Sequence, residues 1–413
     1  MFDVAYARGH YTSLSDGWTY LNAHEGAQIP ERVSSAVTTA FRSAVLMDER
    51  SPLSGTHSRA AEIGANVGDC FLDAARAAVA DLTGAAPDRV VLGPNKAVLL
   101  RSLAEALAPR LRRSTQVLLN KVDDDAVTRP FLRTDSKVVW AEPDLGTGEL
   151  PAWQYEEVVN GSTRFVVVPA AHPLTGMVTD VAAISDIVRS KSRAWILVDA
   201  SAVAPYRAIS IDEWGADIAV VEFAPMGGPQ MAALVFRDTS MFPLLASVNP
   251  AAGVDKAAKL ELGGHSVGLA GGVTAIVDLY AHFAAPGGTR GTRLRRAMSD
   301  IDAYSRRLTA HLLHSLNSLP SVHLLGISGE AAGHGAIDLD RVPRVTFMVP
   351  GVPAATVQRR LLTNGLVTSL SPRNPLLEAM GTFEEGGAIT VGLGPYNTMA
   401  DIDQLTRVLA SLA

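Results

Sequence analysis

The residues whose types and spacing most clearly suggest ligand binding are Asn95, Lys96 and Ala97, in the segment LGPNKAV. This segment is expected to join a strand to the N-terminus of a helix, where free backbone N–H groups and the helix dipole favour an anion. Lys96 could pair with a phosphate there, with the acidic run Asp123–Asp125, or only with water at the surface. The pattern therefore predicts an anion-binding helix start and leaves the partner of Lys96 open.

The elements that must position this segment alternate between helices and short apolar runs. The runs read RVVLG, QVLLN, KVVWAE, FVVVPA, WILVDA, AVVEFA and AALVFR, and the clearest helical patterns cover about 73–82, 96–107 and 181–189. Near-continuous apolar strands between helices are typical of a parallel or mostly parallel sheet covered on both faces. Ligands usually bind at the C-terminal ends of such strands.

A second pattern follows the Gly- and Pro-rich stretch 285–291. A long helix from about 294 to 318 precedes the runs VHLLG and RVTFMV, a helix near 357–364, the run AITVGL and a terminal helix after 397. This order predicts a smaller α+β domain. We expect a large α/β domain over residues 15–285 and a small domain formed by residues 1–14 and 286–413.

Composition narrows the class of protein. The 413 residues are 47% hydrophobic and 19% charged, with a net charge of -6. Such a chain is expected to be a soluble globular protein without nucleic acid or an anionic membrane as its main partner. It contains no apolar run of the roughly 18 residues that a membrane helix needs, and its start, MFDVAYARGH, does not resemble a signal peptide. A cytoplasmic location is the expectation.

Three other features are interpreted as structural. Cys70 is the only cysteine, which excludes a disulfide framework, and its helical surroundings predict a packed helix residue. The glycine-rich segment GGHSVGLAGGVTAI is expected to lead into a helix and to pack closely at a dimer interface. The basic run TRGTRLRR is expected to be a solvated helix start.

Several segments, in order, resemble the class V aminotransferase superfamily and especially its cysteine-desulfurase-like members. They are YLNAHEGAQIPERV, DAARAAVADLTGAAPDRVVLGPN, ILVDASAVAPYRAISIDEWGADIAVVEFAPMGGPQMAALVFRD, KLELGGHSVGLAGGVTAI and ITVGLGPYNTMADIDQLTRVL. The resemblance covers essentially the whole chain. It implies fold type I of the enzymes that use pyridoxal phosphate (PLP), and a homodimer.

Compared residue by residue with the family, the chain retains one central PLP-binding residue and lacks another. Asp199, at the end of WILVDA, matches the carboxylate that pairs with the pyridinium nitrogen of PLP. The position of the Schiff-base lysine is Pro225, which has no amine, so no internal aldimine is expected there. None of the six lysines lies within several residues of Pro225 in the sequence.

Other family positions also differ. The ring-stacking histidine is matched by Asp124, and the asparagine or glutamine near the PLP oxygen falls near Pro173. The substrate-carboxylate arginine is matched by Thr390, and no nearby residue obviously replaces its guanidinium. The nucleophilic cysteine of desulfurases has no counterpart in the matching stretch LVTSLSPRNP.

Three hypotheses follow. The first is a member that keeps the fold and dimer but has lost covalent PLP and its chemistry, and that binds a ligand in the old cleft or serves as a partner or scaffold protein. The second is noncovalent PLP binding, for which the contact candidates are Asp199, Asn95, Lys96, Ala97 and His265. The third is replacement chemistry, by a metal or an acid/base pair, among cleft residues that the family pattern gives as His24, Asp124, His172, Asp199, Glu222 and His265. No metal motif such as H-E-x-x-H supports the metal version.

Overall fold

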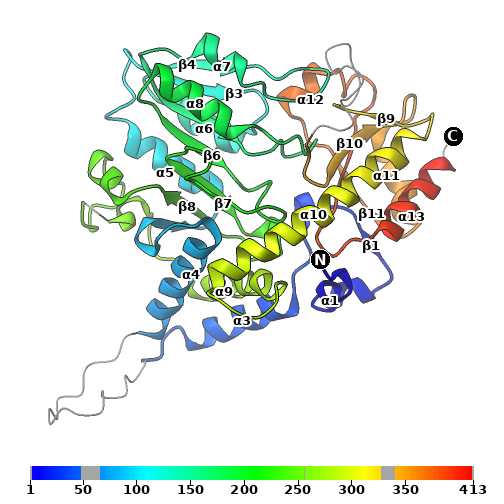
Figure 1. Ribbon diagram of the computed structural model, residues 1–413, viewed down its shortest axis with the longest axis horizontal. Coiled ribbons are helices and arrows are strands. Elements are labelled where there is room, and N and C mark those ends of the chain that lie inside the picture. Colours follow the sequence, from blue (N-terminus) through cyan, green and yellow to red (C-terminus); the bar gives the residue numbers. More distant parts are fainter. Residues whose placement is uncertain (1, 48–65, 255, 327–339, 412–413) are drawn as a thin grey trace.

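The chain is built around a seven-stranded sheet (Figure 1). The computed structural model describes residues 2–47, 66–254, 256–326 and 340–411. In sequence order the strands are β2 (Val90–Gly93), β3 (Gln116–Asn120), β4 (Lys137–Ala141), β5 (Thr163–Pro169), β6 (Trp195–Asp199), β7 (Ile218–Glu222) and β8 (Ala232–Phe236). They lie side by side in the order β2-β8-β7-β6-β5-β3-β4.

The predicted mostly parallel sheet is confirmed, with one antiparallel strand. β8 runs antiparallel to both of its neighbours, β2 and β7, while the remaining pairs are parallel. In this arrangement the last residue of β2, Gly93, and the last residue of β7, Glu222, both pair with Ala232. The ends of β2 and β7 are therefore separated by a single strand.

Helices cover both faces of the sheet. Side chains alternate along each strand, so that Val117 and Leu119 belong to one apolar cluster and Leu118 belongs to the other. One face is covered by α5 (Lys96–Leu107) and α6 (Asp125–Leu132). The other is covered by α4 (Val67–Thr83), α7 (Trp153–Val158), α8 (Val181–Lys191) and α9 (Val267–His282).

The C-terminal part of the chain forms the α+β unit that the sequence predicts. Its helices are α10 (Arg290–Asn317), α11 (Ala354–Thr363), α12 (Pro375–Ala379) and α13 (Met399–Ala410). A four-stranded sheet has the order β12-β13-β10-β9, with β9 (His323–Leu324), β10 (Arg344–Met348), β12 (Ser369–Leu370) and β13 (Ile389–Gly392). The domain boundaries at 15 and 285 stay predictions.

The N-terminal residues join this smaller unit. β1 (Thr19–Tyr20) pairs with β11 (Leu366–Val367), and α1 (Val4–Arg8) and α2 (Ala23–Gly26) flank β1, whereas α3 (Glu31–Ser43) packs against α9 of the large part. Asn22 forms a bridge with Gly392 at the end of β13. The start of the chain is therefore placed beside the sheet of the smaller unit.

One structural expectation needs correction and another stays open. Cys70 lies on α4 as expected but is exposed rather than packed, because it falls on the helix face turned away from the core. The glycines of α9 pack within the chain, since a Cβ atom on Gly271 would lie 2.4 Å from the Cβ of Ala40 on α3, while the dimer interface expected for this segment stays a prediction. No helix in the described ranges is long and apolar enough to cross a membrane.

Candidate functional site

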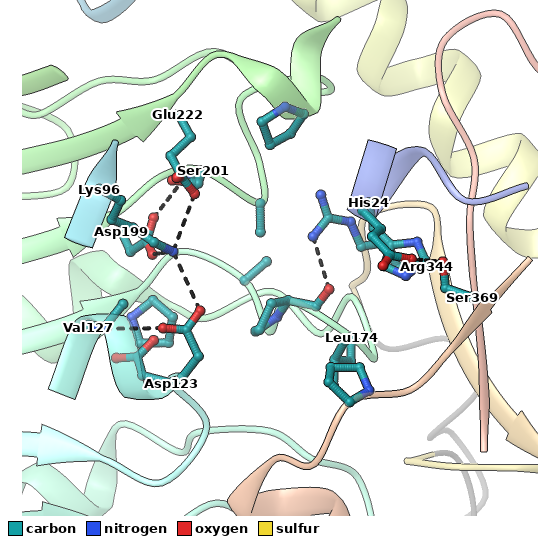
Figure 2. A pocket seen from close by; sticks show the side chains of 18 of the residues that line it. His24, Lys96, Asp123, Val127, Leu174, Asp199, Ser201, Glu222, Arg344 and Ser369 are labelled. Carbon is teal, nitrogen blue, oxygen red and sulfur yellow. Dashed lines mark hydrogen bonds and ion pairs between the residues drawn. The ribbon is translucent and has the colours of Figure 1, made fainter. Parts of the chain in front are cut away.

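A cavity of about 270 Å³ lies where the C-terminal ends of the large-sheet strands face the smaller unit (Figure 2). Its walls come from both parts of the chain. The lining residues include His24, Glu25, Lys96, Asp123, Asp124, Pro169, Pro173, Leu174, Asp199, Ser201, Glu222, Pro225, Arg344, Ser369 and Leu370. Figure 2 shows Lys96, Asp199 and Glu222 on one side of this space and Arg344, His24 and Ser369 on the other.

The acidic end of the cavity centres on Lys96, the first residue of α5. Asn95 caps this helix, because its side-chain oxygen accepts a hydrogen bond from the N–H of Val98 at 2.9 Å. The Lys96 Nζ atom donates to Oδ2 of Asp199 at 2.8 Å, and the other carboxylate oxygen of Asp199 accepts from the N–H of Ser201 at 2.9 Å. The side chains of Lys96 and Asp199 are only 12% and 9% exposed, so this is a buried ion pair.

Two more carboxylates approach the same ammonium group. Lys96 Nζ lies 3.6 Å from Glu222 Oε2 and 3.8 Å from Asp124 Oδ2. Burial alone would lower the pKa of Lys96, but the charges of Asp199, Asp124 and Glu222 outweigh it and hold the pKa above its ordinary value. Lys96 is therefore a charged ammonium rather than a free amine at neutral pH.

The pKa values of the acidic partners Asp199 and Glu222 are shifted in opposite directions. Burial would raise the pKa of Asp199, but the charge and hydrogen bond of Lys96 lower it overall. Burial, with the charge of Asp199, keeps the pKa of Glu222 raised, although Lys96 opposes this through its charge and through a backbone hydrogen bond. Glu222 thus lies near the ammonium of Lys96 but is less tightly paired with it than Asp199.

Asp123 is a fourth acid, which sequence reasoning did not single out from its neighbours. Its Oδ2 accepts a hydrogen bond from Asn120 Nδ2 at 2.6 Å, and it is buried beneath the cavity. Burial, reinforced by the charge of Asp199, raises the pKa of Asp123 to about 8 against the opposing hydrogen bond from Asn120. At neutral pH this acid is mainly protonated.

The opposite end of the cavity holds a buried cation. Arg344 begins β10 and is 3% exposed, and its Nη1 donates to the carbonyl oxygen of Pro173 at 3.0 Å. Its Nε has no hydrogen-bond partner, and no ion pair joins it to a carboxylate within the described ranges. Figure 2 shows the guanidinium directed into the cavity.

Arg344 corrects one expectation from the sequence. Thr390, at the family's arginine position, pairs across the small sheet with Thr346, which stands two residues after Arg344 on the same face of β10. Strand β10, next to β13, therefore places the guanidinium of Arg344 near the position where the family has its arginine. The signal in the sequence was the charged residue at the start of the otherwise apolar run RVTFMV, but its strand neighbour depends on the fold.

His24 closes the wall beside Arg344. It lies on the short helix α2, and a Cβ atom on Gly392 would come within 2.5 Å of its Nδ1. Burial, together with the charge of Arg344, lowers the pKa of His24 to about 3, so the ring is neutral at ordinary pH. Nearby, the hydroxyl of Ser369 donates to the carboxylate of Glu25.

The structure brings together five of the predicted site residues and separates the others. The five that line the cavity are His24, Lys96, Asp124, Asp199 and Glu222. Asp124 lines it while also capping α6, because its Oδ1 accepts from the N–H of Val127 at 3.1 Å. The reading of Lys96 as a hydrated surface lysine is wrong, since its side chain is buried against Asp199.

Four predicted residues do not line this cavity. The Asn95 side chain caps α5, and Ala97 faces a separate groove between α5 and α6. His172 is buried, with its Nδ1 accepting from the backbone N–H groups of Leu174 and Thr175. His265 instead pairs with Glu261, four residues earlier in the same loop, at 2.9 Å.

The arrangement also bears on metal chemistry. In the part of the chain that the structure describes, no group of three or more histidine, cysteine or carboxylate side chains is arranged to hold a metal ion. The reason is that Lys96 occupies the centre of the acidic end, while His24 stands beside Arg344 across the cavity. The cavity thus has an acidic end and a cationic end.

Comparisons with known proteins agree with the fold. The sequence profile described as Aminotransferase class-V matches residues 19–405. The uncharacterized protein MT3887 of Mycobacterium tuberculosis is 41% identical, over 100% of this chain and 99% of that protein. The aminotransferase-like protein FGM3 of Gibberella zeae is 26% identical, over 82% of each chain.

Solved structures show the same architecture at low sequence identity. The cysteine desulfurase of Thermococcus onnurineus aligns with a TM-score of 0.80 at 17% identity, covering 100% of this chain and 98% of that one. The desulfurase CsdA of Escherichia coli aligns with a TM-score of 0.78 at 18% identity, with the same coverage. At this identity the likeness establishes fold type I and nothing about the reaction.

Proposed function

The chain belongs to the class V aminotransferase family, and we propose that it holds no covalent PLP and instead binds a small molecule in the cavity. The observation that carries this proposal is the ion pair between Lys96 and Asp199. It occupies the carboxylate that would otherwise pair with the coenzyme ring. The family's transaminase and desulfurase reactions would then be absent from this member.

The amines near the cavity do not suit an aldimine. Pro225 lines the cavity at the family's lysine position and has no amine. Lys96 is the one lysine that lines it among the described residues. Condensation with an aldehyde needs a neutral amine, and the surrounding carboxylates keep Lys96 protonated. These two residues support the loss of the covalent link.

The chain's own side chains fill both places where the family anchors PLP. The ammonium of Lys96 takes the Asp199 oxygen that a pyridinium N–H would use. Glu222, whose Oε2 lies 3.6 Å from the Lys96 ammonium, places a carboxylate beside the start of α5, where an anionic phosphate would bind. With Asp124 included, three carboxylates surround one ammonium, and this negative excess disfavours a phosphate dianion. The residues present therefore do not fit PLP.

Desulfuration has a further obstacle. Ser369, Leu370 and Pro372 of the small-domain stretch LVTSLSPRNP border the cavity, and the stretch carries no thiol. Cys70, the only cysteine, lies on α4 and does not line the cavity. A cysteine nucleophile is thus missing from the place where the resemblance would require it.

The test is an absorption spectrum of the purified protein incubated with PLP, followed by borohydride reduction, dialysis and peptide mapping. We expect no aldimine band and no peptide-bound coenzyme. The variant Pro225→Lys alone should also fail, because Lys96 and Glu222 still fill the anchors. The triple variant Lys96→Ala, Glu222→Ser, Pro225→Lys should retain PLP through residue 225. Coenzyme fixed to Lys96 of the unaltered protein would overturn the proposal.

A further inference from the structure

The charges that remain free in the cavity indicate what kind of molecule it takes. We propose that the cavity binds a small bipolar ligand, with a carboxylate on Arg344 and an ammonium group at Glu222 and Asp124. This inference rests on the proposed function, because the ligand would occupy the space from which PLP is excluded. It concerns a noncovalent complex and involves no reaction step.

The anionic end of the ligand is defined by Arg344. Its guanidinium is 3% exposed, has an Nε without a partner and forms no ion pair within the described ranges. Leaving a buried guanidinium without a counter-ion is costly, and a carboxylate can take two parallel hydrogen bonds from it. The neighbouring His24 ring is neutral and adds no competing charge. This end of the cavity therefore lacks an anion.

The cationic end is defined by the carboxylates that Lys96 does not satisfy. Asp199 is fully engaged, since one oxygen accepts from Lys96 and the other from Ser201. Glu222 and Asp124 lie farther from the ammonium, at 3.6 and 3.8 Å, and their side chains are 30% and 50% exposed toward the cavity and solvent. Neither carboxylate is within hydrogen-bond distance of the Lys96 ammonium, so this end of the cavity can accept a second cation.

The space between the two ends suits a short ligand. A cavity of about 270 Å³ lies at the lower limit of typical small-molecule sites, which run from about 300 Å³ upward. The buried hydroxyl of Ser201 lines it and has no hydrogen-bond partner in the described structure. A short linear amino carboxylate would place one charge at each end and a polar or flexible chain beside this hydroxyl.

Two simpler ligands match the site less well. An inorganic anion such as phosphate would satisfy Arg344 but would leave the negative excess around Glu222 unrelieved. A divalent cation would relieve that excess, but no suitable ligand group is present in the described residues. Only a ligand with both a negative and a positive group is complementary in charge to both ends of the cavity.

The experiment is calorimetric titration of PLP-free protein with unbranched ω-amino carboxylates, from glycine to 6-aminohexanoate. Each is compared with the alkyl carboxylate and the alkylamine of the same length. We expect at least one bipolar compound to bind with one-to-one stoichiometry, about 10-fold or more tightly than either matched compound. Inorganic phosphate serves as the anion-only probe and should bind more weakly.

Two variants test which end of the cavity binds the carboxylate of the ligand and which binds its ammonium group. Arg344→Gln should weaken the bipolar compound about 10-fold and erase its advantage over the alkylamine, while Glu222→Gln should erase its advantage over the carboxylate. Arg344→Lys, which keeps the charge but not the fork, provides a second measurement if Arg344→Gln does not fold. Arg373→Gln, at an exposed arginine outside the cavity, should leave binding unchanged.

Three results would overturn the inference. They are no binding by any member of the series, a matched carboxylate that binds as tightly as the bipolar compound, and binding that survives both Arg344 variants. None of these results depends on the borohydride test. If the protein excludes PLP but does not bind amino carboxylates, only the inference about the ligand is refuted. If PLP is trapped on Lys96, the proposed function is refuted.

Discussion

Replacing Lys96 by methionine should destabilise the protein strongly, because it leaves Asp199 buried without its counter-ion. The two side chains are 12% and 9% exposed and their charged atoms lie 2.8 Å apart. Breaking a buried pair by removing one partner typically costs about 3–5 kcal/mol. We expect a loss of about 3 kcal/mol at pH 7, since Ser201 still donates one hydrogen bond to Asp199.

The pH dependence identifies the cause of this loss. Lys96 has a raised pKa in the folded protein, so its contribution is complete below its unfolded pKa and is lost as the pH rises through the folded value. Asp199 has a lowered pKa, so its contribution is present above about pH 4 and is lost as the pH falls through the folded value. The deficit of the variant should therefore be greatest near neutrality and should shrink below about pH 4.

The assay is urea unfolding of both proteins at several pH values, followed by circular dichroism. The double variant Lys96→Met, Asp199→Asn should recover most of the loss, because it removes the uncompensated charge. Lys121→Met is the matched control: its pair with Glu142 is exposed and should contribute at most about 1 kcal/mol. Equal stability of Lys96→Met and the unaltered protein across this pH range would refute the buried ion pair.

Two further predictions concern the walls of the cavity. Asp123 has a pKa of about 8, above its unfolded value, so its contribution to stability is complete below about pH 4 and is lost as the pH rises toward 8. The variant Asp123→Asn should therefore flatten the dependence of the free energy of unfolding on pH between about 4 and 8. An unchanged slope in this range would contradict the prediction. Gly392→Ala would place a Cβ atom 2.5 Å from His24 Nδ1 and should cost about 1–3 kcal/mol in thermal unfolding. Gly264→Ala, where a Cβ atom meets nothing within 4 Å, should unfold like the unaltered protein.

Much of the fold could be predicted because it is encoded locally. Runs such as WILVDA and FVVVPA are continuous because both faces of their strands are buried, and this burial also explains the helices on each side. The direction of β8 could not be predicted in this way. AALVFR is apolar whether it runs parallel or antiparallel to its neighbours, and its direction is set by the short connection from β7.

The site was predictable only in part, because its residues meet through the topology. Asp199 and Pro225 were both identified from the resemblance to the family. The partner of Lys96 was left open, since nothing in the sequence relates position 96 to position 199. Arg344 was missed for the same reason: its place beside Thr390 follows from the pairing of β10 with β13.

The ion pair of Lys96 with Asp199 also has a consequence for how the protein folds. The two residues are 103 positions apart, and in the sheet the strands that precede Lys96 and contain Asp199, β2 and β6, are separated by β8 and β7. Because a long loop must close before the two charges meet, we expect their pairing to follow the rate-limiting barrier of folding. The loss of Lys96 should therefore accelerate unfolding while leaving the refolding rate nearly unchanged. The residue that we propose to exclude the coenzyme would then also slow the unfolding of the protein.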